Sequence, residues 1–176
     1  MPIAKEILDM QENSSDRNYV LNTVKSNGKL LEFAEDELRN DREIVLEAVK
    51  NNPEALEFAS KRLKADREIV YESVSKLGWT YCYADEKLLN DKELIMSGLE
   101  KSGQILYFAS TKMRDDKDVV LKAIEDKPII VKYASKRLRN DKEIAIKVMQ
   151  KNKKCYQFLE PEIQKDEDVL KIKNEE

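Results

Sequence analysis

Seven aspartates recur along this chain at a constant spacing of 25 residues. They are Asp16, Asp41, Asp66, Asp91, Asp116, Asp141 and Asp166. Because no insertion interrupts the spacing, the sequence predicts tandem copies of one structural unit, each packed against its neighbours. We number six complete repeats from these aspartates, from residues 16–40 for the first to residues 141–165 for the sixth. Repeats of this length form extended assemblies rather than a single enclosed pocket.

Each repeat opens with the pattern of a helix start. In the second repeat, Asn40 or Asp41 can accept hydrogen bonds from free backbone amides, and Glu43 follows Asn40 at capping-box spacing. The sequence leaves open which of the two residues is the N-cap. Apolar residues then recur at helical spacing, and the third of them is small in five repeats: Thr23, Ala48, Ser73, Gly98 and Ala123. A small residue here is expected to let a neighbouring backbone come close, and Val148 is the exception.

A glycine or proline interrupts each of the first five repeats, at Gly28, Pro53, Gly78, Gly103 and Pro128. Glycine there is expected to take a left-handed C-cap, and proline to open the next helix. An aromatic residue follows in all six repeats: Phe33, Phe58, Tyr83, Phe108, Tyr133 and Phe158. These features predict a second helix of about ten residues whose aromatic column lies in the core. Truncation of one such phenylalanine to alanine would then cost about 3–5 kcal/mol.

The predicted fold is therefore all-α, an α-solenoid of about six two-helix repeats of 25 residues. Residues 16–165 form the repeats, residues 1–15 an N-terminal capping helix, and residues 166–176 a C-terminal capping helix. Neither helix of a repeat can bury its apolar face alone, so packing between repeats must supply the core.

The repeat pattern resembles a known family. Its elements are an aspartate followed by a base and an acid, an apolar run, a glycine or proline, and an aromatic–alanine pair. The segment NDREIVLEAVKNNPEALEFASKRLKADREIV shows them most clearly. This pattern is similar to the helical repeats called domain of unknown function 4116, over about residues 16–170. The resemblance implies a helical repeat scaffold and brings no catalytic residues. Leu159 and Pro161 depart from the pattern in the sixth repeat.

The composition argues against catalysis. The chain has no histidine, which removes the commonest acid–base catalyst and zinc ligand, and its four glycines form no phosphate-binding loop. We therefore expect no enzymatic activity, no catalytic residue, no metal site and no cofactor. No apolar run is long enough to cross a membrane. The N-terminal residues predict no secretory signal, and two isolated cysteines fit a cytoplasmic location.

One candidate binding surface is aromatic. Trp79, Cys82 and Tyr107 fall at positions that are charged or polar in other repeats. An apolar patch on a charged surface is typical of a protein-binding site, so these three residues are the candidate contacts with a protein partner. The alternative is that Trp79 packs against Tyr83 of its own helix.

A second candidate surface is basic. The residue after the repeat aspartate is Arg or Lys in all six complete repeats, and Arg42, Arg67 and Lys92 are the candidates for binding a small anionic or nucleotide ligand beside helix N-termini. The alternative is a ladder of ion pairs with the neighbouring acids. Residues 116–165 also carry 13 basic and 8 acidic residues, but a chain pI near 5.4 makes a nucleic-acid partner the weaker expectation. Binding of another protein is the leading prediction.

Overall fold

The computed structural model describes residues 2–175 of the chain, with side chains from Lys5 onward. Within these residues the protein is built from helices and turns and contains no strand. The predicted all-α repeat fold is therefore confirmed. Met1 and Glu176, the outermost residues of the predicted capping segments, lie outside the described part. The chain divides into two compact units, Met1–Leu88 and Leu89–Glu176.

An α-helix opens every repeat, and the repeat aspartate is its N-cap. These helices are α2 (Arg17–Ser26), α3 (Arg42–Asn51), α5 (Arg67–Lys76), α6 (Lys92–Leu99), α8 (Lys117–Asp126) and α10 (Lys142–Lys151). At α3 the extended backbone of Asp41 lets its carboxylate accept hydrogen bonds from the amides of Glu43 and Ile44, at 2.9 and 3.3 Å. The choice between Asn40 and Asp41 is thus resolved in favour of the aspartate.

The second predicted helix is different from the expectation. Instead of about ten α-helical residues, each repeat has a short 3₁₀ helix: η1 (Gly28–Phe33), η3 (Pro53–Phe58), η4 (Gly78–Tyr83), η6 (Gly103–Tyr107), η7 (Pro128–Tyr133) and η8 (Lys153–Phe158). A brief third segment follows: η2 (Leu38–Asn40), α4 (Lys61–Lys64), η5 (Glu86–Leu88), α7 (Thr111–Arg114), α9 (Lys136–Arg139) and η9 (Ile163–Lys165).

A hydrogen bond between repeats explains the break. Ala59 is extended, with φ −63° and ψ 150°, and the next amide, of Ser60, donates to the carbonyl of Arg39 in the preceding repeat at 2.9 Å. The Ser60 hydroxyl then accepts from the amide of Leu63 and caps α4. A continuous helix would have directed the Ser60 amide to its own repeat. The second helix is therefore interrupted at Ala59, and the repeat is hydrogen-bonded to the preceding repeat instead.

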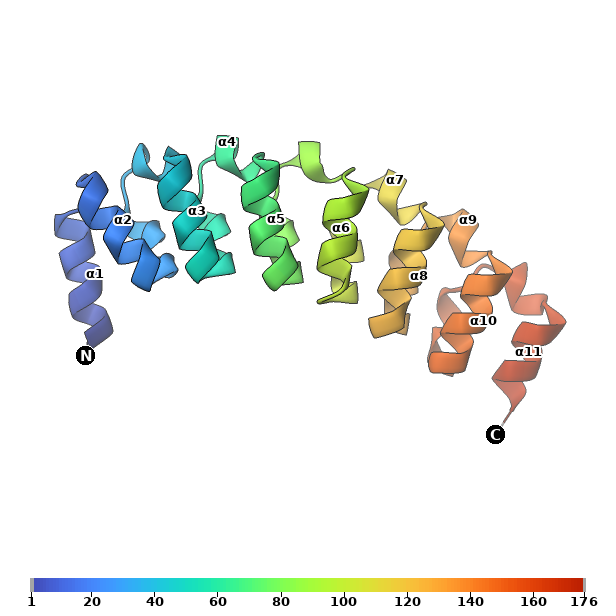
Figure 1. Cartoon of the computed structure of the whole chain (residues 1–176). Coiled ribbons are helices and arrows are strands. Elements are labelled where there is room, and N and C mark those ends of the chain that lie inside the picture. Colours follow the sequence, from blue (N-terminus) through green and yellow to red (C-terminus); the bar gives the residue numbers. More distant parts are fainter. Residues whose placement is uncertain (1, 176) are drawn as a thin grey trace. The chain divides into compact units, whose positions relative to one another are not determined.

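The helices of each unit form two layers. In the first unit α2, α3 and α5 lie side by side, and η1, η3 and η4 form the second layer against them (Figure 1). The second unit has the same arrangement, with α6 beside α8, α10 beside α11 (Glu167–Asn174), and η6, η7 and η8 in the other layer. The N-terminal helix α1 (Pro2–Glu12) contacts η1. At the C-terminal end, Val169 of α11 is buried against Ala145 and Met149.

The core lies at positions other than the predicted aromatic column. In the second repeat Ile44, Val45, Ala55 and Leu56 are completely buried, whereas Phe58 is only half-buried. Its counterpart in the fourth repeat, Phe108, is 37% exposed. The prediction of a buried aromatic column was therefore wrong. Ala55 and Leu56 of the same 3₁₀ helix take the buried positions instead.

The glycines of the second layer serve close packing rather than backbone conformation. No described glycine has a positive φ, so the expected left-handed C-cap is not formed. A Cβ atom on Gly28 would lie 2.2 Å from the carbonyl oxygen of Ala48, and one on Gly103 would lie 2.3 Å from that of Ala123. A backbone thus comes close at Ala48 and Ala123, as the sequence predicted, and the missing Cβ of each glycine leaves room for it.

Replacement of Gly28 by alanine should lower the free energy of unfolding by about 1–3 kcal/mol, because α3 must move to relieve the overlap. Equilibrium urea unfolding followed by circular dichroism measures the change. Glu32→Ala, an exposed position of the same 3₁₀ helix, is the matched control and should stay within about 0.5 kcal/mol of the parent chain. A Gly28→Ala variant as stable as this control would contradict the prediction.

Candidate functional site

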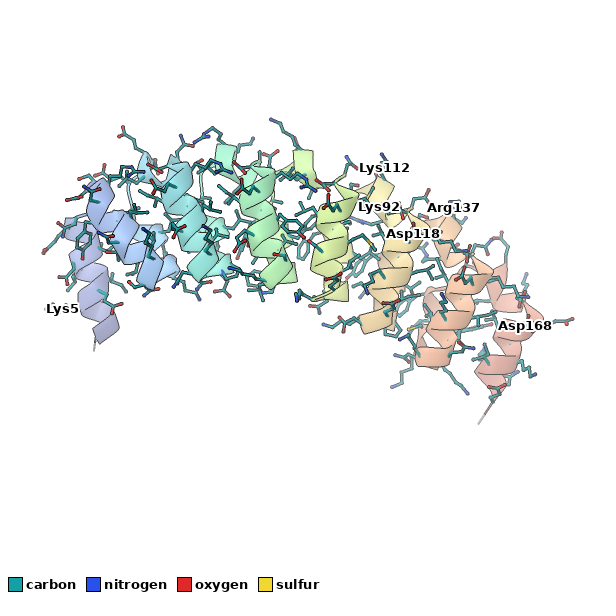
Figure 2. The ribbon with its side chains drawn as sticks, in the orientation of Figure 1. Lys5, Lys92, Lys112, Asp118, Arg137 and Asp168 are labelled. Carbon is teal, nitrogen blue, oxygen red and sulfur yellow. The ribbon has the colours of Figure 1, made fainter. Side chains whose placement is uncertain are left out.

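The basic column forms a ladder of ion pairs between repeats. Arg42 Nε donates to Asp66 Oδ2 at 2.8 Å, and the same guanidinium binds Glu68. Lys92 Nζ of α6 likewise lies 2.8 Å from Asp118 Oδ2 of α8 and also binds Asp116; Figure 2 labels Lys92 and Asp118 close together. Arg17, Lys117 and Lys142 make the corresponding pairs. Each of these five bases therefore joins its own repeat to the N-cap and first-turn acid of the next.

These pairs weaken the case for an anion site at the column. Arg42 and Lys92, two of the three candidate residues, each face two carboxylates, and Arg67 also has an interaction partner. A phosphate or nucleotide would have to displace those carboxylates before it could bind. The column's geometry matches the ion-pair alternative, and the anion-binding role stays an untested prediction.

The three candidates for the protein-binding patch are divided between the two units. Trp79 and Cys82 lie three residues apart in η4 of the first unit, which places them on one face of a 3₁₀ helix. Tyr107 lies in η6 of the second unit. Trp79 and Cys82 are therefore described with the first unit and Tyr107 with the second.

The side chains around Trp79 already make contacts within the first unit. The Trp79 and Tyr83 rings meet edge to face with centroids 5.5 Å apart, which is the alternative that the sequence left open. The Tyr83 hydroxyl donates to Glu57 at 2.9 Å. Burial, followed by this carboxylate, raises the pKa of Tyr83 to about 12, so the phenol stays protonated. Burial also raises the pKa of the half-buried Cys82 thiol, which disfavours the thiolate form.

The surface around Tyr107 is open. Tyr107 is 51% exposed, and its ring contacts both Phe108, at 4.9 Å between centroids, and Tyr133 of the next repeat, at 4.8 Å. Both contacts are edge to face, which fixes the three rings relative to one another. We call these three residues the aromatic cluster.

A hollow of about 220 Å³ lies at the aromatic cluster. Gln104 and Ile130 complete its lining, and more of the exposed lining is apolar than polar. Nearby, Ile129 is 46% exposed. Lys132 Nζ lies 4.8 Å from the Tyr133 ring centre, in the range of a cation–π contact. The structure therefore provides a small, apolar, aromatic-walled depression with a positive charge at its edge.

The comparison with protein families agrees with the repeat geometry. The family described as Domain of unknown function (DUF4116) matches residues 16–64, 66–114 and 116–164. The three matches begin at Asp16, Asp66 and Asp116, which are every second one of the repeat aspartates. The chain belongs to this family. Each family match thus spans two of the 25-residue repeats described above. No curated protein and no solved structure matched the chain.

Membership of DUF4116 brings no functional residue with it, so the site rests on this chain's own side chains. Sequence reasoning nominated Tyr107 but missed Phe108 and Tyr133, because it assigned the aromatic column to the core. Ile129 offered a usable signal, since Lys29, Glu54 and Lys154 occupy its position in other repeats. In the part of the DUF4116 chain that the structure describes, no helix combines the length and apolarity needed to cross a membrane.

Proposed function

We propose that this protein is a non-enzymatic repeat scaffold that binds another protein through the aromatic cluster. The observation that carries the proposal is the half-exposed Tyr107, held between Phe108 and Tyr133 over an apolar hollow. Large aromatic side chains that are ordered before binding lose little conformational freedom on contact, which is why they dominate the energetics of protein interfaces.

Two further properties belong to the proposal. The absence of histidine and of a phosphate loop favours binding over catalysis. Cys82 and Cys155 are both free thiols, which fits a reducing compartment and hence a cytoplasmic location.

Substitution of Tyr107 by glutamate should abolish binding of the partner while the fold is retained. A buried charge in place of a central aromatic costs a typical interface at least about 2 kcal/mol, or roughly thirtyfold in Kd. Native mass spectrometry of tagged protein, recovered gently from the lysate of its own host, measures the bound polypeptide. Its mass identifies the same partner from one variant to the next.

Tyr71→Glu is the matched control, because Tyr71 is 38% exposed but belongs to α5 of the first unit and is not part of the aromatic cluster. This variant should retain the partner, and the melting temperatures of both variants should stay within about 2 °C of the parent chain. Retention of the partner by Tyr107→Glu would refute the proposed surface. A collapse of the melting temperature in that variant would assign Tyr107 to folding instead.

A further inference from the structure

A second hollow, of about 320 Å³, shares a wall with the aromatic cluster. It is lined by Arg114, Lys132, Lys136 and Arg139 together with Tyr133, which also lines the apolar hollow. We call this second depression the basic hollow. Both hollows lie within the second unit and are formed by the fourth and fifth repeats.

The basic hollow has more positive charge than its own carboxylates neutralise. Arg139 is bound to the buried Glu160, with Nη2 2.5 Å from Oε1. Asp115, the residue after Arg114 of the lining, is bound to Arg137 at 3.0 Å, and Arg137 lies outside the lining. Among the side chains that the structure describes, Arg114, Lys132 and Lys136 form no ion pair, and Arg114 Nε donates to a backbone carbonyl, of Ala109. Three cationic groups of the hollow thus remain available to an anion.

The first unit contains the same depression three repeats earlier, with a different charge. There Arg39 and Lys64 occupy the positions of Arg114 and Arg139. Asp36 and Glu57 stand where the basic hollow has Thr111 and Lys132, and Asp36 is bound to Arg39. The fold therefore accepts acids at both positions. The excess positive charge is a property of the fifth repeat's side chains and not a requirement of the architecture.

We propose that the basic hollow and the aromatic cluster together bind one acidic segment of a partner polypeptide. An apolar side chain of that segment occupies the hollow at Tyr107, and a carboxylate a few residues away occupies the basic hollow. This proposal rests on the proposed function and specifies the partner's chemistry. Charge complementarity selects an acidic partner and speeds the encounter, while the aromatic contacts supply most of the affinity. Guanidinium and ammonium groups beside a partly apolar wall bind a carboxylate more strongly than in open water.

Selection from a library of random peptides of about 12 residues tests the proposal without knowledge of the partner. The library is selected in parallel on the parent chain and on the Lys132→Glu, Lys61→Glu and Tyr107→Glu variants. Lys132→Glu places at this position the residue type that the first unit already has at Glu57, so the fold should tolerate it. Lys61→Glu is the matched control, because Lys61 is the exposed counterpart of Lys136 in the first unit and changes the net charge equally.

The parent chain and Lys61→Glu should enrich peptides that carry an Asp or Glu near an aromatic or aliphatic residue. Fluorescence polarisation of the best such peptide should show binding at least about tenfold weaker to Lys132→Glu, and a steep loss of affinity with added salt. Tyr107→Glu should lose the peptides altogether.

Each of the other outcomes would refute one named part of the proposal. Enrichment of apolar peptides without acids would refute the role of the basic hollow and leave the proposed function intact. Peptides that bind the parent chain and Tyr107→Glu equally well would refute the proposed function itself, and so would a selection that enriches no peptide. A labelled single-stranded oligonucleotide is tested in the same way. If it binds the parent chain but not Lys132→Glu, and no acidic peptide is selected, the basic hollow binds nucleic acid and the peptide proposal is wrong.

Discussion

Leu56→Ala should lower the free energy of unfolding by about 2–5 kcal/mol, whereas Phe58→Ala, two residues away in η3, should lower it by only about 1–2 kcal/mol. Leu56 is completely buried between the two layers, so its truncation removes apolar contacts and leaves a cavity. Phe58 is half-buried at the surface of the second layer, so solvent fills most of the space that its ring leaves. The smaller side chain is therefore the more costly one to remove.

Equilibrium urea unfolding of both variants, with the unfolding slope fitted separately for each, checks this order. Glu32→Ala, at the exposed counterpart of Glu57 in η1, provides a control for substitution in a 3₁₀ helix of the same layer. If Phe58→Ala proved the more destabilising of the two, the aromatic column would belong to the core after all. The layer arrangement described for η3 would then be incorrect.

Acidification should remove several kcal/mol of stability, because every complete repeat begins with an aspartate N-cap worth about 1 kcal/mol. For Asp66, burial acts to raise the pKa, but hydrogen bonds from Arg42 and from the amides of Ile69 and Glu68 outweigh it and lower the pKa below 3.8. The pKa values of Asp41, Asp116, Asp141 and Asp166 are lowered in the same sense. A lowered folded-state pKa stabilises the fold fully above the unfolded value of about 3.8, and this contribution is lost as pH falls through the folded value.

Urea unfolding midpoints measured from about pH 8 to pH 2 should therefore stay nearly level down to about pH 5 and then fall. The unfolding midpoint should not change above about pH 5, because the chain has no histidine to titrate in that range. Asp66→Asn is the informative variant, since asparagine is an equally good N-cap but carries no charge for Arg42. It should reduce the acid-dependent loss without removing helix α5. A midpoint at pH 2 equal to that at pH 7 would contradict the prediction.

The sequence predicted those parts of the fold that depend on neighbours along the chain. Asp41, the amides that it caps and the apolar positions Ile44 and Val45 lie within one helical turn, so local rules place the start of α3 to within one residue, at Asn40 or Asp41. The constant spacing of the aspartates predicted the repeat, and the small residue at Ala48 predicted that a backbone comes close there, which the structure shows to be that of Gly28.

The second layer depends on distant partners, and there the prediction failed. The extended conformation of Ala59 accompanies a hydrogen bond between Ser60 and Arg39, 21 residues earlier, and no local preference of alanine announces it. The sequence Ser60–Lys61–Arg62–Leu63 did contain an N-cap signal, which would have favoured a separate short helix. The aromatic column was placed in the core because its spacing was read with the period of an α-helix.

Part of the candidate site was also within reach of the sequence. Tyr107 was recognised as an exception in a polar column, but the basic hollow was not, because its charge balance depends on which bases already have partners. Alignment of the repeats shows Asp36 against Thr111 and Glu57 against Lys132, two losses of negative charge. That these two positions border one depression follows only from the packing of successive repeats.

The ladder that links Arg17 to Asp41, Arg42 to Asp66 and Lys117 to Asp141 also bears on how the chain acquires its structure. Each of these three links closes a loop of 24 residues, so none of them requires a distant part of the polypeptide. Short loops of this kind are fast to close and cost little entropy, which gives the protein a low contact order. A pair of repeats could therefore become ordered on the ribosome while later repeats are still being synthesised, with each new rung added as its aspartate emerges.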